Sequence, residues 1–291
     1  MRDWFVKRFE FVSLAKRYCK NWLYLVTAYL IGNEPEHMVL RRDNLKIAPY
    51  EGARGVYQLL LLFKLGWFVQ DCDSTYLLLG NEDGMRLKCR RNTEDVESLI
   101  GIYEKRHFEC SCEDKIVVDV GMNNGDTSIY FAMRGARLVI GLEPFGDSYR
   151  LARENIELNK MQQLVIPVEA ALASYEGEAT LLSSFTKPTS SSLLNSGVDL
   201  DASEFGLRSH VRTTTLRQLT VELGLERIDI LKLNCEGCEF DVLPNMPSEM
   251  FEVMQEVVLQ VHGRPEALTE FLASHGFEVR YSDTILYAKR R

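Results

Sequence analysis

The chain has 291 residues, enough for one large domain or for a domain with a substantial extension. Apolar residues make up 46% and charged residues 26% of the chain, which is ordinary for a soluble globular protein. A formal net charge of −8 does not provide the basic footprint that broad nucleic-acid binding needs, so we expect no nucleic-acid partner.

Residues 1–31 differ in composition from the rest of the chain. They contain six Lys and Arg residues against two acids, with apolar and aromatic side chains at helical spacing. The run Trp22–Ile31 is apolar, but its ten residues are too few to cross a bilayer, which takes about 20. The segment can lie on an anionic membrane surface, or dock on the protein itself or on a second subunit. We favour docking, against a buried helix predicted over Gly55–Trp67.

A hairpin and a further helix are predicted next. Thr75–Cys89 contains two apolar runs separated by Asn81-Glu82-Asp83-Gly84, which supplies turn chemistry. Thr93 precedes an acid-rich turn and predicts the start of a helix that ends near Arg106. We therefore expect a helical and hairpin extension over residues 1–106 and a second domain over residues 107–291.

Predicted strands alternate with predicted helices after residue 114. Strands are expected over KIVVDV, ARLVIGLE, LVIPVEAAL, RIDILKLN and EVVLQVH, with two closing strands in FEVRYSDTILYAKRR. These runs lack strict period-two alternation, which is typical of a parallel sheet covered on both faces. The second domain is therefore predicted to be a doubly wound α/β domain.

Seven cysteines and no recognisable signal peptide predict a reducing, cytoplasmic setting. Two pairs suggest a metal site, namely Cys110 with Cys112 and Cys235 with Cys238. The first pair precedes one predicted strand and the second pair follows another, so the pairs should lie roughly 15 Å apart. Zinc ligands all lie within about 2.3 Å of one ion. We therefore expect no metal, and buried or unpaired thiols instead.

The stretch VVDVGMNNGDTS, from Val117 to Ser128, lies at the carboxyl end of the first predicted strand, where doubly wound sheets bind ligands. Gly121 and Gly125 allow the backbone to turn tightly and to approach a ligand closely. Glu143 ends the second strand about 20 residues later, where an acid can hydrogen-bond both ribose hydroxyls. Glu169 ends the third strand, where the edge of an adenine ring would lie.

Asp119 discriminates between nucleotide ligands. A carboxylate about 4 Å from a pyrophosphate charge costs roughly 4 kcal/mol at an effective dielectric of 20, and the middle glycine of the dinucleotide fingerprint is missing. A nucleoside with a cationic tail and no phosphate avoids this cost, so we predict S-adenosylmethionine as the cofactor, with a nicotinamide oxidoreductase as the disfavoured alternative. The expected cofactor-binding residues are Asp119, Gly121, Asn123, Asn124, Gly125, Asp126, Thr127, Glu143, Pro144, Glu169 and Ala170.

These motifs, together with LARENIELNK, VEAALASYEGEATL and LKLNCEGCEFDVL, have the order and spacing of a known family. From about Thr93 to Arg291 the chain resembles the FkbM-like S-adenosylmethionine-dependent methyltransferases. The resemblance implies a Rossmann-like methyltransferase sheet, mostly parallel with an antiparallel last strand, and O-methylation of sugar or polyketide hydroxyls. The family signature K-x-D-x-E-G-x-E is present as Lys232, Asn234, Glu236, Gly237 and Glu239.

A hydroxyl acceptor has to lose a proton during methyl transfer, so a base is needed. The candidates are Glu236, Glu239 and His262, and an imidazole with a pKa of about 6.5 suits this role. Lys232 is expected to neutralise the two glutamates. Asn234 stands where the family usually has Asp, and it can hold a hydroxyl but cannot accept a proton as a carboxylate does.

The expected activity is O-methylation of a hydroxyl on a sugar, a glycolipid or a small molecule. The alternatives are a methyltransferase for another acceptor class and a non-catalytic S-adenosylmethionine-binding module, in which Asn234 would mark lost chemistry. The Ser-rich segment Ser183–Leu194 either covers the site or is a plain surface loop. We also expect a homodimer, and a cytoplasmic location that is peripheral to the membrane if residues 1–31 bind lipid.

Overall fold

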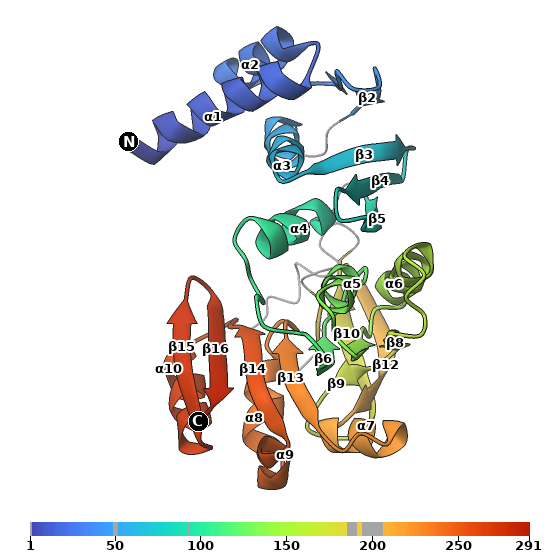
Figure 1. The fold of residues 1–291 in the computed structure, drawn as a ribbon, viewed down its shortest axis with the longest axis vertical. Helices are drawn as coiled ribbons and strands as arrows, with labels where there is room; N and C mark the ends of the chain where they lie inside the picture. The colour runs from blue at the N-terminus through green and yellow to red at the C-terminus, as the bar shows by residue number, and fades with distance from the viewer. Residues whose placement is uncertain (1, 49–51, 92, 185–190, 194–205) are drawn as a thin grey trace. The chain divides into compact units, whose positions relative to one another are not determined.

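The computed structural model describes residues 2–48, 52–91, 93–184, 191–193 and 206–291, and of residues 2–6 the backbone alone (Figure 1). The chain divides into two compact units, residues 1–106 and residues 107–291. The smaller unit holds helices and short antiparallel sheets, and the larger unit holds a seven-stranded α/β sheet.

Helices and two small sheets make up the described part of the smaller unit. The predicted hairpin is confirmed, since its two strands pair antiparallel across the turn at Asn81–Gly84. The helix predicted over Gly55–Trp67 exists but ends at Lys64, because Gly66 takes a left-handed φ of 86° and Trp67 begins a strand. The elements are α1 (Arg2–Tyr18), α2 (Trp22–Ile31), β1 (Met38–Val39), β2 (Lys46–Ile47), α3 (Gly52–Lys64), β3 (Trp67–Cys72), β4 (Tyr76–Asn81), β5 (Arg86–Arg90) and α4 (Asp95–Tyr103).

The apolar run of α2 is buried on one side only. Leu25 and Ala28 are buried, whereas Leu23 and Ile31 are 63% and 64% exposed. One face of the run is therefore buried within the smaller unit and the other is exposed, and docking of the whole run stays a prediction. No helix among the described residues is long and apolar enough to cross a membrane.

The main sheet of the larger unit has the strand order β8-β7-β6-β13-β14-β16-β15. Neighbouring strands from β8 to β14 are parallel, and β16 is antiparallel to both of its neighbours, which confirms the predicted fold class. Its strands are β6 (Ile116–Val120), β7 (Leu138–Leu142), β8 (Val165–Val168), β13 (Ile228–Leu233), β14 (Met254–Gln260), β15 (Phe277–Ser282) and β16 (Ile285–Arg290).

Helices connect these strands, and the central strands are buried throughout. Every residue of β6 and of β13 is buried, which explains why both read as continuous apolar runs rather than alternating ones. The helices are α5 (Asp126–Met133), α6 (Gly146–Leu158), α7 (Leu216–Leu223), α8 (Cys238–Asn245), α9 (Ser248–Glu252) and α10 (Pro265–Ser274).

The larger unit also contains a second sheet that the sequence did not predict. Its strand order is β11-β10-β12-β9, with β9 (Ala171–Leu172), β10 (Gly177–Ser183), β11 (Ser192–Leu193) and β12 (Leu207–Thr214). The single strand predicted over LVIPVEAAL is divided, because the chain leaves β7 after Val168 and Ala171 pairs with Thr213 of β12 instead. A pairing with a strand about 40 residues later leaves no local signal in the sequence.

The strand order reverses between β6 and β13. From β6 the chain proceeds outward through β7 and β8, and β13 then lies on the other side of β6. Open α/β sheets bind ligands beyond the carboxyl ends of the strands at such a point. Here the two loops touch, because a Cβ atom on Gly121 would lie 2.0 Å from the carbonyl oxygen of Asn234.

We predict that Gly121→Ala is far more destabilising than Gly224→Ala. Both glycines have left-handed φ angles, 73° and 62°, but nothing lies within 4 Å of a Cβ atom added to Gly224. Gly224→Ala should cost about 1–2 kcal/mol of conformational energy, and Gly121→Ala should add roughly 1–3 kcal/mol for separating the two loops. Urea denaturation measures both, and equal losses would contradict the close contact.

Candidate active site

A buried ion pair organises the carboxyl ends of β6 and β13. Asp119 and Lys232 lie opposite each other on these adjacent strands, and both side chains are at most 1% exposed. The Lys232 ammonium nitrogen is 2.7 Å from Oδ1 of Asp119. Oδ2 of Asp119 accepts hydrogen bonds from the hydroxyls of Thr127 and Ser128, each at 2.6 Å. The carboxylate therefore joins β6, β13 and the first turn of α5.

Lys232 also holds the glycine turn. Its ammonium group donates hydrogen bonds to the backbone carbonyls of Val120 at 3.2 Å and Gly121 at 2.9 Å. One expectation is corrected here. Lys232 pairs with Asp119 and not with the two glutamates of the signature, and protein groups bind both oxygens of the fully buried Asp119 carboxylate.

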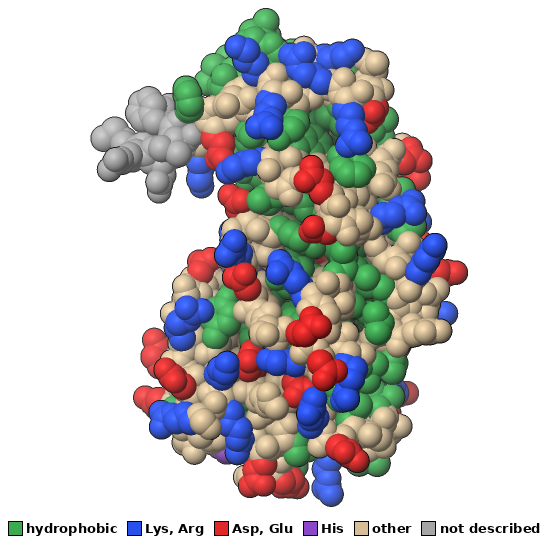
Figure 2. All heavy atoms as spheres, viewed as in Figure 1, with side chains coloured by type: hydrophobic (Ala, Val, Ile, Leu, Met, Phe, Trp, Pro, Cys, Tyr) green, Lys and Arg blue, Asp and Glu red, His purple; other side chains and the backbone are tan. Residues whose placement is uncertain are grey.

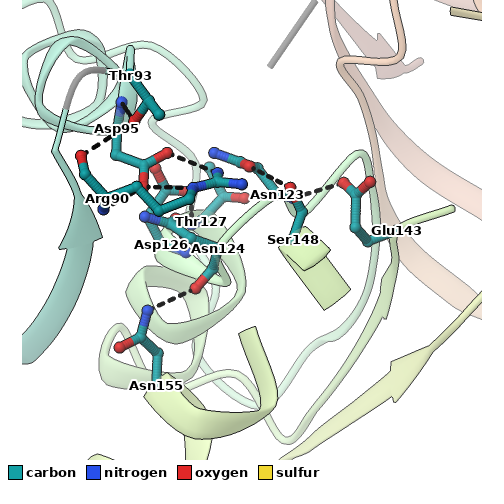
Figure 3. A network of polar contacts seen from close by, with 10 residues as sticks. All are labelled: Arg90, Thr93, Asp95, Asn123, Asn124, Asp126, Thr127, Glu143, Ser148 and Asn155. Carbon is teal, nitrogen blue, oxygen red and sulfur yellow. Dashed lines mark hydrogen bonds and ion pairs between the residues drawn. The ribbon is translucent and has the colours of Figure 1, made fainter. Parts of the chain in front are cut away.

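Glu143 follows β7 and connects two loops at the carboxyl edge of the sheet. One of its oxygens accepts the backbone N–H of Asn123 at 2.9 Å, and the other accepts the N–H of Phe145 at 2.8 Å. Glu143 therefore holds the glycine turn and its own loop together at the edge of the sheet where open α/β sheets bind ligands. Figure 3 shows Glu143, Ser148 and Asn123 side by side, and the Ser148 hydroxyl donates to Oδ1 of Asn123 at 3.1 Å.

Asn124 stabilises the second half of the glycine turn. Its Oδ1 accepts the backbone N–H of Asp126 at 3.3 Å, and its carbonyl accepts a hydrogen bond from Asn155 at 2.9 Å (Figure 3). Gly125 takes a φ of 86° at the residue that precedes α5. Within the part of the chain that the structure describes, the buried Nδ2 of Asn124 has no hydrogen-bond partner.

The remaining predicted cofactor residues lie along the neighbouring strand ends. Glu169 is exposed just after β8, and its carboxylate lies beside the start of α6, 3.2 Å from where a Cβ atom on Gly146 would be. Pro144 is half-buried next to Glu143, and Ala170 is buried. The structure therefore places these residues along one edge of the sheet.

Three of the predicted catalytic residues form a compact cluster beyond β13 and β14. His262 Nδ1 lies 3.1 Å from Oε1 of Glu239, and His262 Nε2 lies 3.3 Å from Oε1 of Glu236. Glu239 is fully buried and also accepts the backbone N–H groups of Gly237 at 3.0 Å and His262 at 2.9 Å. The Glu236 side chain is 26% exposed, so one carboxylate of the cluster reaches solvent.

The charge of His262 differs from the expectation. Burial lowers the pKa of His262, but hydrogen bonds and the negative charges of Glu236 and Glu239 outweigh burial and raise the pKa to about 10. The side chain is therefore an imidazolium at neutral pH. A protonated imidazole cannot accept a proton, so the raised pKa argues against His262 as the general base.

Asn234 follows β13 and lies against the glycine turn. Its backbone N–H donates to the carbonyl of Val120 at 3.0 Å, and its Oδ1 is buried without a hydrogen-bond partner among the described residues. The Ser-rich segment reaches the same loop, because the Ser192 hydroxyl donates to the carbonyl of Glu236 at 2.7 Å. The remainder of Ser183–Leu194, residues 185–190 and 194, lies outside the described residues.

A disulfide closes the loop that carries Glu236, which corrects the expectation of unpaired thiols. Cys235 is bonded to Cys238, while Cys110 and Cys112 remain thiols with their sulfur atoms 3.3 Å apart. Between the bonded cysteines, Glu236 takes a φ of 51° and Gly237 a φ of 104°. The spacing C-x-x-C is the local sequence signal for this pairing.

Residues 119–279, more than half of the chain, match the family described as the methyltransferase FkbM domain. A seven-stranded, mostly parallel sheet with a glycine turn at the switch point agrees with a methyltransferase domain. The chain belongs to the FkbM methyltransferase family.

Two curated proteins illustrate the similarity. The AMB antimetabolite synthetase AmbE of Pseudomonas aeruginosa is 30% identical over 204 residues, which is 57% of this chain and 10% of that protein's length. The methyltransferase sdnD of Sordaria araneosa is 25% identical over 190 residues, 56% of this chain and 73% of that protein. Among solved structures, a methyltransferase FkbM from Methylobacillus flagellatus is 11% identical with a TM-score of 0.44, covering 96% of this chain and 58% of that chain.

We predict that His262 stays protonated well above neutral pH. Its folded-state pKa exceeds the ordinary value of about 6.5, so its stabilising contribution is complete below that pH and is lost as the pH rises through about 10. Histidine NMR resonances followed between pH 5 and 11, with His262→Gln for assignment, measure the pKa. A pKa shift of one unit corresponds to roughly 1.4 kcal/mol of stability. As the pH rises toward about 10, the unfolding free energy of the parent should therefore fall more steeply than that of His262→Gln. Titration of His262 below pH 7 would contradict the structure.

Proposed function

We propose that this chain is an S-adenosylmethionine-dependent methyltransferase that acts on a hydroxyl oxygen of a sugar, a glycolipid or another small molecule. The observation that carries the proposal is the cluster of Glu236, Glu239 and His262 beyond β13 and β14. It follows the strand that contacts the glycine turn at the switch point, so a base candidate and the predicted cofactor site share one edge of the sheet.

The nucleoside half of the cofactor fits the residues at this edge. Glu143 offers carboxylate acceptors suited to ribose hydroxyls, and Gly121 and Gly125 keep side chains away from the turn. The aminoacyl half needs a different partner from the one expected, because Asp119 is paired with Lys232. The buried Oδ1 of Asn234, which has no partner among the described residues, is a neutral acceptor that can serve an ammonium or a hydroxyl donor, and the backbone carbonyl of the same residue lies against Gly121.

When bound, S-adenosylmethionine supplies an electrophilic methyl group, and transfer to oxygen requires the acceptor hydroxyl to give up its proton. Glu236 is the best candidate for receiving this proton, since its carboxylate is the partly exposed one. Glu239 is fully buried and holds the loop and His262 by hydrogen bonds. The His262 ring contacts Glu239 through Nδ1 and Glu236 through Nε2, so it lies between the two carboxylates and orients Glu236.

Similarity to the antimetabolite synthetase AmbE favours a small-molecule acceptor over a macromolecule. The net charge of −8 argues in the same direction, because it disfavours a polyanionic nucleic acid. A protein that binds the cofactor without transferring the methyl group is the competing function, and measurements of cofactor affinity and of turnover separate it from an enzyme.

We predict that Glu143→Ala weakens S-adenosylmethionine binding by roughly 10- to 100-fold, because hydrogen bonds to a charged group contribute about 1.5–3 kcal/mol. Isothermal calorimetry measures the affinity, with NAD as a competing ligand. Glu226→Ala serves as the control, since Glu226 is exposed and precedes β13 at the opposite edge of the sheet. Unchanged affinity in Glu143→Ala, or tighter binding of NAD, would refute the cofactor assignment.

A second prediction concerns turnover. Glu236→Gln removes the proposed base and keeps the shape of the side chain, so single-turnover methyl transfer should fall by about 10²-fold or more while cofactor affinity changes little. Labelled cofactor with a panel of sugars, glycolipids and small-molecule hydroxyl compounds identifies the substrate, and Glu226→Gln is the matched control. Cofactor binding without any labelled product from the parent chain would favour the non-catalytic function, and full activity in Glu236→Gln would exclude Glu236 as the base.

A further inference from the structure

An exposed apolar face runs along α2 in the smaller unit. Leu23, Leu30 and Ile31 are 63%, 49% and 64% exposed, and Thr27 is exposed between them. Positions 23, 27, 30 and 31 recur at helical spacing, so these side chains share one face of the helix, opposite the buried Leu25 and Ala28. We call residues 23, 27, 30 and 31 the α2 face.

Basic residues of α1 lie at both ends of α2. The guanidinium carbon of Arg8 is 5.9 Å from the ring centre of Tyr29, and the ammonium nitrogen of Lys16 is 5.8 Å from that of Trp22. Phe11 stacks on Tyr29 with ring centres 4.2 Å apart, so the two helices are antiparallel neighbours. Figure 2 shows Lys and Arg side chains gathered with hydrophobic ones over α1 and α2.

Acidic residues are absent from α2 and from the second half of α1. Residues 11–33 contain no Asp or Glu, and they include Lys16, Arg17 and Lys20, whereas Glu34 and Glu36 follow α2. The nearby Glu10 is already paired, with Lys64 at 2.9 Å and the Tyr57 hydroxyl at 2.7 Å. The smaller unit has 17 Lys and Arg against 14 Asp and Glu, a net charge of +3, whereas the larger unit has 17 against 28, a net charge of −11. The positive charge of the chain is thus concentrated in the unit that exposes the α2 face.

Charge and length discriminate between the possible occupants of the α2 face. A transmembrane arrangement is excluded for α2, because ten residues span about 15 Å and a bilayer core is about 30 Å thick. A second copy of the chain, packed on the same face, would bring two segments of net positive charge together. An anionic lipid surface satisfies both the exposed aliphatic side chains and the net positive charge of residues 1–33.

We propose that the α2 face, together with Arg8, Lys16 and Lys20 of the same α1–α2 segment, binds the surface of membranes that contain anionic lipids. The aliphatic side chains enter the boundary between headgroups and acyl chains, and the basic side chains contact lipid phosphates. This reverses the preference for docking that the sequence alone suggested, because the structure leaves half of the apolar run of α2 exposed. The proposal does not depend on the methyltransferase chemistry.

Sedimentation with vesicles tests this proposal on the full chain. Vesicles of phosphatidylcholine with about one third phosphatidylglycerol should pellet the protein at low salt, and binding should fall at least tenfold in about 0.5 M salt or on pure phosphatidylcholine. Leu23→Ser with Ile31→Ser should lower binding at least tenfold, as should Arg8→Gln with Lys16→Gln. The matched controls are Val221→Ser, which changes an aliphatic side chain that is 70% exposed on α7, and Arg212→Gln with Arg217→Gln, two exposed basic residues of the larger unit.

Each outcome bears on the proposal. Circular dichroism should show unchanged folding in all variants, since the altered aliphatic side chains are exposed and the basic variants retain polar groups. Absence of pelleting, equal binding to neutral vesicles, or equal loss in the control variants would overturn the proposal. A dimer in analytical ultracentrifugation that dissociates in Leu23→Ser with Ile31→Ser would assign the α2 face to a second copy of the chain and would also overturn it.

Discussion

The contact between Asp119 and Lys232 is the constraint on which the rest of the larger unit depends. Two charges buried side by side carry a desolvation penalty of several kcal/mol each, which is recovered only where further hydrogen bonds satisfy them. Here the carboxylate receives two hydroxyl donors, and the ammonium group reaches the carbonyls of Val120 and Gly121. The pair therefore sets the position of β6 against β13 and of the glycine turn above both strands.

The position of Glu143 depends on the glycine turn. Glu143 accepts the backbone N–H of Asn123 from the turn and that of Phe145 from its own loop. The carboxylate that we propose for ribose binding thus holds two loops together. A substitution of Glu143 therefore removes hydrogen bonds that maintain the loops as well as the proposed contact with the cofactor.

Electrostatic interactions also hold together the cluster of Glu236, Glu239 and His262 beyond β13 and β14. Two carboxylates near one imidazole favour its charged form more strongly than burial disfavours it, which raises the pKa of His262. The Glu239 carboxylate is buried and the Glu236 carboxylate is partly exposed, so two chemically similar residues have different access to solvent. The Cys235–Cys238 disulfide and the Ser192 hydroxyl hold the short loop that carries Glu236.

The sequence by itself determined the order of strands and helices in the larger unit, the glycine turn and the acid at Glu143, because hydrophobic periodicity and residue spacing are local properties. It also identified Glu236, Glu239 and His262 as neighbours of one sheet edge. Only the tertiary structure decided that Lys232 pairs with Asp119, that His262 is charged and that β9 pairs with β12, since each depends on partners distant in the chain. Only the structure showed which face of α2 is exposed, because the single polar residue Thr27 in an otherwise apolar and aromatic run of ten gives no amphipathic pattern.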